Sequence, residues 1–67
     1  MRPCRNDKRV IQVAADAAGL PPARFFVEVE HDYVLVNHPE SMKWPAETRA
    51  AIKAAVERFT GMRAAVT

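Results

Sequence analysis

The chain has 67 residues, a formal net charge of +2 and a single cysteine, Cys4. It has no run of the roughly 18 apolar residues that a membrane span needs, and one cysteine excludes an internal disulfide. We therefore expect one domain over residues 1–67 in a cytoplasmic protein, and because a core this small stabilises a fold only marginally, we expect a homodimer.

Residues 1–6 are predicted to be a basic, flexible arm. Four of the first nine residues are basic, namely Arg2, Arg5, Lys8 and Arg9. A local cluster of this kind is either a phosphate contact or an ordinary solvated chain end, and the sequence leaves both interpretations open.

A first helix is predicted over residues 7–18. Asn6 is a good N-cap and Asp7 suits the first turn, while the apolar residues that follow recur at helical spacing. Gly19 supplies a left-handed position after the helix, and Pro21 and Pro22 forbid its continuation.

Residues 25–38 alternate between apolar and polar on both sides of a short break at His31 and Asp32. This pattern predicts a β-hairpin in which Val29 faces Val34, Val27 faces Val36 and Phe25 faces His38, all on one apolar surface. The opposite surface would carry a mixed set that is too apolar for an ordinary solvated face: Phe26, Glu28, Glu30, Tyr33, Leu35 and Asn37.

A second helix is predicted from Pro45, as the first helical residue, to a stop at Gly61. Its apolar stripe would consist of Thr48, Ile52, Ala55, Val56 and Phe59. Residues 62–67 either add a last turn or form a frayed tail.

The predicted fold class is a small α+β fold of the order α-β-β-α, with an antiparallel hairpin and both helices packed on one face. Its strand edges carry no guarding Pro or Lys, so two subunits could also join into a four-stranded sheet. The other face is left open, unless Met42, Trp44 or the C-terminal tail covers it.

No catalytic residue, metal ligand or cofactor site is expected. His31 and Asp32 fit a solvated turn, His38 fits a residue that caps the core, and Glu28 and Glu30 have no third acidic partner.

Two segments resemble the final part of HicA-type mRNA interferase toxins: Val-Leu-Val-Asn-His-Pro at residues 34–39 and Trp-Pro-Ala-Glu-Thr-Arg-Ala-Ala-Ile-Lys at residues 44–53. The resemblance implies an α-β-β-β-α fold like that of double-stranded-RNA-binding domains, with a catalytic histidine after Gly-Ser. Here His31 stands at the candidate position and follows Val29 and Glu30 instead. The resemblance thus implies a nucleic-acid-binding scaffold or, failing that, RNA cleavage by His31.

Two functions therefore remain open. The first is a non-enzymatic interaction module, an adaptor or inhibitor that binds a larger protein through the open hairpin face or edge, with Phe26, Glu28, Glu30, Tyr33 and Leu35 as the interface. The alternative is a nucleic-acid-binding protein whose phosphate contacts come from Arg2, Arg5, Lys8, Arg9, Lys43, Arg49 and Lys53.

Overall fold

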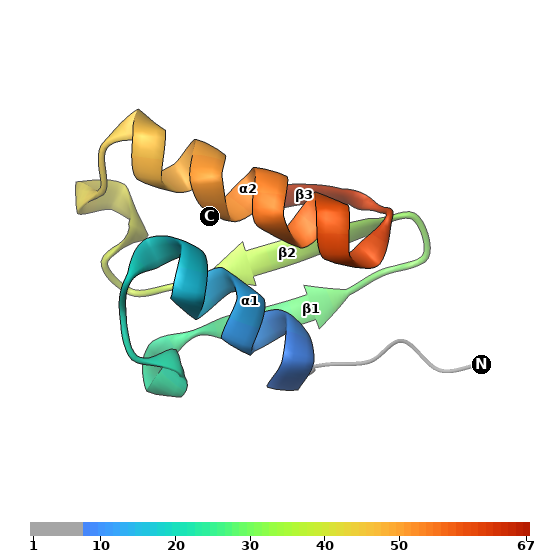
Figure 1. Ribbon diagram of the computed structural model, residues 1–67, viewed down its shortest axis with the longest axis horizontal. Helices are drawn as coiled ribbons and strands as arrows, with labels where there is room; N and C mark the ends of the chain where they lie inside the picture. The colour runs from blue at the N-terminus through green and yellow to red at the C-terminus, as the bar shows by residue number, and fades with distance from the viewer. Residues whose placement is uncertain (1–7) are drawn as a thin grey trace.

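The computed structural model describes residues 8–67, so the arm expected at residues 1–6 and the cap expected at Asn6 lie outside the described residues. The elements are α1 (Lys8–Ala18), β1 (Phe26–Val29), β2 (Tyr33–Asn37), α2 (Ala46–Thr60) and β3 (Arg63–Val66), with short 3-10 helices at Pro22–Arg24 and Ser41–Lys43. The strands form one sheet in the order β1-β2-β3, and both helices lie on the same side of it (Figure 1). The predicted α+β class is confirmed.

The hairpin forms with the predicted register. β1 and β2 are antiparallel, with Val27 opposite Val36 and Val29 opposite Val34. The backbone N–H of Glu30 donates to the carbonyl oxygen of Tyr33 at 2.8 Å, which leaves residues 31–32 as a two-residue tip. The inward valines of β2 are fully buried beneath the helices, so the hairpin supplies the floor of the core.

α1 ends as its sequence predicts. Gly19 adopts a left-handed φ of 70°, and the N–H of Gly19 bonds the carbonyl of Asp16 at 3.2 Å while that of Leu20 bonds Ala15 at 3.0 Å. This pair of bonds satisfies carbonyls that the helix end would otherwise leave exposed. The helix buries mainly Val10, Ala14 and Ala15, and these small side chains let α1 lie close against α2.

α2 begins one residue later than predicted. Pro45 is extended, with ψ at 159°, and serves as the N-cap, so Ala46 is the first helical residue. At the other end Gly61 has a left-handed φ of 72°. Ile52 and Val56 are buried as expected, whereas Phe59 is 51% exposed and does not belong to the buried stripe.

The C-terminal segment is neither a helical turn nor a frayed tail, because it forms β3, parallel to β2. Val34 lies opposite Ala64 and Val36 opposite Val66, and the N–H of Thr67 bonds the carbonyl of Val36 at 2.8 Å. A parallel neighbour requires a crossover, which α2 supplies. β2 consequently becomes the central strand, so only β1 and β3 remain as edges for any longer sheet.

Candidate functional site

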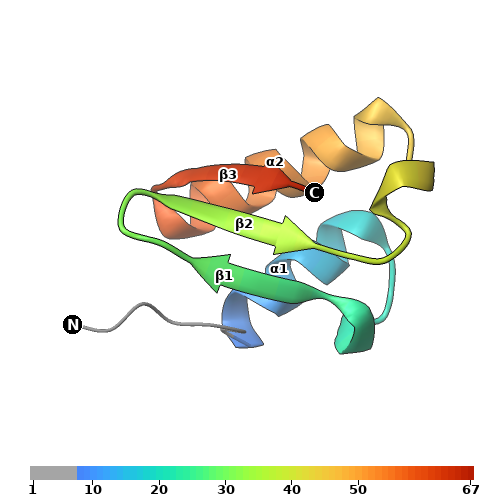
Figure 2. The ribbon, with the colours of Figure 1, turned by 180° about the vertical axis from the view of Figure 1, so that it is seen from behind.

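The surface of the sheet that faces away from the helices, called here the open face, is formed by all three strands (Figure 2). Phe26, on the edge strand β1, is 50% exposed, and Tyr33, near the hairpin tip, is 39% exposed. Leu35 lies in the row between them and is partly buried. By strand alternation the open face consists of Phe26, Glu28, Glu30, Tyr33, Leu35, Asn37, Arg63 and Ala65. All five residues that the sequence assigned to a protein interface therefore lie on one surface.

The rest of the described chain does not cover this face. Met42 is 92% exposed, and Trp44 packs on the helix side against Phe25. The C-terminal strand lies beside β2 instead of over it. Apolar side chains that stay exposed together on one surface mark a contact site more often than scattered ones do.

Charges of opposite sign lie at the two edges of the open face. Glu28 and Glu30 project from the β1 side and Arg63 from the β3 side. Arg63 and Ala65 are site residues that sequence reasoning missed, because residues 62–67 were not predicted to be a strand. Residues 63–66, Arg-Ala-Ala-Val, show no alternation of polar and apolar side chains, so the sequence carries no local signal for this strand.

His38 is a core residue. Its ring lies 4.7 Å from that of Phe25 and 4.7 Å from that of Trp44, and it is only 5% exposed. Nδ1 of His38 accepts a hydrogen bond from the backbone N–H of Glu40 at 3.1 Å, which holds the turn after β2. The expectation that this histidine caps the core agrees with that geometry, whereas His31 and Asp32 are exposed at the hairpin tip.

The outer edge of β3 is tied to α2 by a carboxylate. Oε2 of Glu57 accepts from the backbone N–H of Ala64 at 3.0 Å and from Nζ of Lys53 at 2.9 Å. The hydrogen bond from Lys53, followed by that from Ala64, lowers the pKa of the Glu57 carboxyl below its ordinary value of 4.5, with a small further contribution from the charge of Arg63. The edge N–H of Ala64 is thus already used within the chain.

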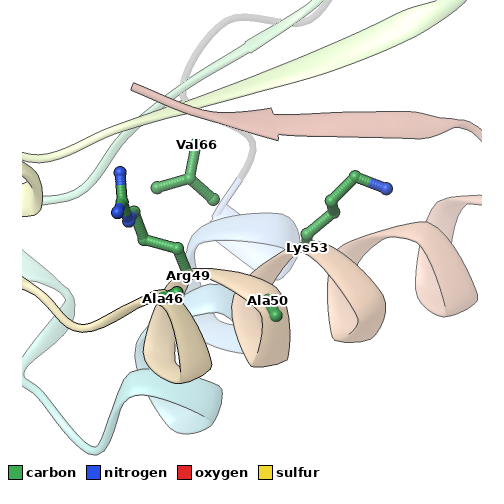
Figure 3. A pocket seen from close by; sticks show the side chains of 5 residues that line it. All are labelled: Ala46, Arg49, Ala50, Lys53 and Val66. Atoms are coloured by element: carbon green, nitrogen blue, oxygen red, sulfur yellow. The ribbon is translucent and has the colours of Figure 1, made fainter.

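Two of the predicted phosphate contacts come together beside β3. Arg49 and Lys53 both extend from α2 on the side of β3, one to each side of Val66, and line a shallow hollow of about 260 Å³ with Ala46 and Ala50 (Figure 3). Lys53 is partly neutralised by Glu57. Arg49 enters no ion pair with another residue in the range 8–67.

The remaining predicted cations do not join that group. Lys8 lines a separate hollow of about 580 Å³ between α1 and the start of β1, and Lys43 is exposed at the end of the 3-10 helix before α2. Arg9 lies in the first turn of α1, and Arg2 and Arg5 lie outside the described residues. The cations therefore do not form one continuous basic surface over the described part of the chain.

No group of three or more histidine, cysteine or acidic residues that could hold a metal ion occurs within residues 8–67. Across the same range, neither helix has the length and apolar character needed to cross a bilayer.

In comparisons with known proteins, no family model, no curated protein and no solved structure matches this chain.

Proposed function

We propose that the protein is a small, non-enzymatic interaction module, an adaptor or inhibitor that binds a larger protein through the open face. The observation that supports this is the exposure of Phe26 and Tyr33 around Leu35 on a surface that nothing in the described chain covers. Exposed aromatic groups are the side chains that most often contribute strongly to binding when a partner excludes water from them.

The charges of the open face define the chemistry of that partner. A complementary partner has basic groups opposite Glu28 and Glu30 along the β1 edge. It has an acidic group opposite Arg63 along the β3 edge. The partner therefore has an apolar centre with charges of opposite sign on its two sides, since complementary charges set orientation and association rate.

The test uses two double variants and one captured partner. The tagged chain is first used to isolate bound proteins from an extract of the source cells. A candidate whose binding saturates is then purified and titrated against the chain. Phe26→Ser with Leu35→Ser should abolish that binding, whereas Arg49→Gln with Lys53→Gln should leave it within a few fold. Equal affinity of the first variant and the unmodified chain would overturn the proposal.

A second candidate is nucleic-acid binding of the kind that the HicA resemblance implies. It is favoured by the placement of Arg49 and Lys53 on one hollow. The order of elements here is α-β-β-α-β, in place of the α-β-β-β-α order that the resemblance implies, so this candidate rests on the cations and not on the fold.

The same variants separate the two candidates. A labelled RNA duplex and a labelled single strand are titrated at two salt concentrations. Nucleic-acid binding predicts an affinity that falls steeply with salt and is lost in the Arg49/Lys53 variant alone. Loss of labelled RNA that depends on His31, tested with His31→Ala, would instead favour the cleaving alternative.

A further inference from the structure

We propose that two copies of the chain pair through the open face, about a two-fold axis that runs parallel to β2. This inference rests on the proposed function, because it uses the same surface and specifies a second occupant for it. It is argued from the arrangement of side chains in rows across the sheet, from the charges at the ends of those rows and from the state of the sheet edges.

The open face is organised into cross-strand rows. The N–H of Glu30 bonds Tyr33, and Tyr33 lies opposite Arg63, so these residues form the first row. Glu28, Leu35 and Ala65 form the second row, and Phe26 and Asn37 begin the third. Each of the first two rows has an acidic residue on the β1 side, Glu28 within β1 and Glu30 just after it, an apolar or aromatic residue on β2 and a basic or small residue on β3.

A two-fold axis above β2 and parallel to it places β1 of one copy over β3 of the other and keeps each row at its own level. Glu30 then faces Arg63 of the partner subunit, twice in the dimer. On the axis itself, Tyr33 meets Tyr33 of the partner subunit and Leu35 meets Leu35 of the partner subunit. The first row thus supplies opposite charges at both ends and an aromatic pair at the centre.

The charges select this axis over the other in-plane choice. An axis perpendicular to the strands would place β1 over β1, so that Glu28 and Glu30 would face the same two carboxylates of the partner subunit. Like charges opposed across an interface are unfavourable. None of Glu28, Glu30 and Arg63 forms an ion pair with another residue of the described range 8–67, although the charge of Arg63 also acts on Glu57.

The sheet edges are less suited to self-pairing than the open face is. β2 is internal because β3 pairs with it. At the outer side of β3, the Glu57 carboxylate already occupies the N–H of Ala64, and a strand added there would have to displace it. Because each subunit has three strands, a continuous sheet across two subunits would have six strands instead of the four expected from the sequence, and it would need the β1 edge. Pairing through the open face requires no internal contact to be broken.

The size of the face sets the strength of the association. Three strands about 4.8 Å apart and about four residues long present a surface of roughly 15 by 15 Å. This is well below the roughly 800 Å² per partner of a standard interface, so the dimer is weak and must be sought between about 10 µM and about 1 mM. Self-pairing at these concentrations would compete with the larger partner for the open face.

The test is a charge exchange measured by sedimentation equilibrium of the full chain. The unmodified chain should approach the mass of a dimer as its concentration rises. Arg63→Glu and Glu30→Arg should each weaken self-association about tenfold or more, because each puts like charges opposite one another. An equimolar mixture of the two variants should dimerise again, since both facing pairs are then of opposite sign.

Arg49→Glu is the matched control, because it reverses an exposed cation that lies beside β3 on the helix side and should leave the dimer unchanged. A chain that stays monomeric at about 1 mM, a mixture that fails to dimerise, or a control that behaves like Arg63→Glu would each overturn the inference. If the chain is monomeric but the Phe26/Leu35 variant still loses its partner, the proposed function stands without the dimer. If mixing the two variants restores the dimer but the unmodified chain captures no larger partner, the dimer stands and the proposed function fails.

Discussion

At the scale of single residues, His38 joins the end of β2 to the turn that follows it. The ring contributes contacts to Phe25 and Trp44, and Nδ1 accepts the N–H of Glu40. His38→Ala removes both, so we expect it to lower the free energy of unfolding by about 2 kcal/mol. Urea unfolding followed by the fluorescence of Trp44 measures this change.

His31→Ala is the control for that experiment, because His31 is exposed at the hairpin tip. A surface substitution of this kind should change the free energy of unfolding by no more than about 0.5 kcal/mol. If both histidine variants unfolded at the urea concentration of the unmodified chain, the ring cluster and its hydrogen bond would contribute nothing to stability.

Glu57 gives a prediction with a defined dependence on pH. Its pKa is lowered in the folded chain, first by the hydrogen bond from Lys53 and then by that from Ala64. A carboxyl whose pKa is lower when folded than when unfolded contributes stability that is present above pH 4.5 and is lost as the pH falls below that value through the folded pKa. Glu57→Gln should therefore lower the urea midpoint at pH 7.

The difference between Glu57→Gln and the unmodified chain should shrink when both are unfolded at pH 3, because below pH 4.5 the unfolded chain already binds a proton at Glu57. Lys53→Gln removes the largest cause of the lowered pKa, so it should reduce this pH dependence while keeping the carboxylate in place. If the urea midpoint of Glu57→Gln lay below that of the unmodified chain by the same amount at both pH values, the charged hydrogen bonds would not be the cause of the difference.

At the scale of elements, β3 makes a distinct prediction for amide exchange. The N–H of Ala64 points outward to Glu57 and that of Thr67 points inward to Val36. Because N–H directions alternate along a strand, the N–H of Ala65 points toward β2 and that of Val66 points outward. Hydrogen exchange followed by NMR should therefore show slow exchange at Ala65 and Thr67 and fast exchange at Val66.

Glu57→Gln serves as the control for the exchange pattern, since it should speed exchange at Ala64 more than at Ala65. A C-terminal segment that was frayed would show uniformly fast exchange over residues 63–67 instead. That result would remove Arg63 and Ala65 from the open face together with β3.

The same strand explains where the sequence was informative and where it was not. The hairpin could be predicted because alternation and a two-residue break are local signals, and they placed Phe26, Tyr33 and Leu35 on one face correctly. β3 could not be predicted in this way, because its alanines have low β-propensity. Its pairing with β2 is also not local, since it depends on the crossover by α2. Arg63 was therefore missed as a site residue.

At the scale of the whole molecule, stability rests on a small core. The largest fully buried side chains are Val27, Val34, Val36, Ile52 and Val56. A natural chain of this length is stable by about 0.05–0.15 kcal/mol per residue, which comes to roughly 3–10 kcal/mol in total. Each of these core side chains consequently accounts for a large part of the total free energy of unfolding.

We expect Val36→Ala and Val56→Ala to lower the free energy of unfolding by about 1–3 kcal/mol each, because both side chains are fully buried and their methyl groups would leave cavities. The double variant should be largely unfolded at 37 °C if the total margin is near the lower end of that range. Thermal unfolding followed by circular dichroism tests this, with Met42→Ala as the control because Met42 is 92% exposed. If the double variant had the same melting temperature as Met42→Ala, the free energy of unfolding would come from association and not from the core. The melting temperature should then rise with protein concentration.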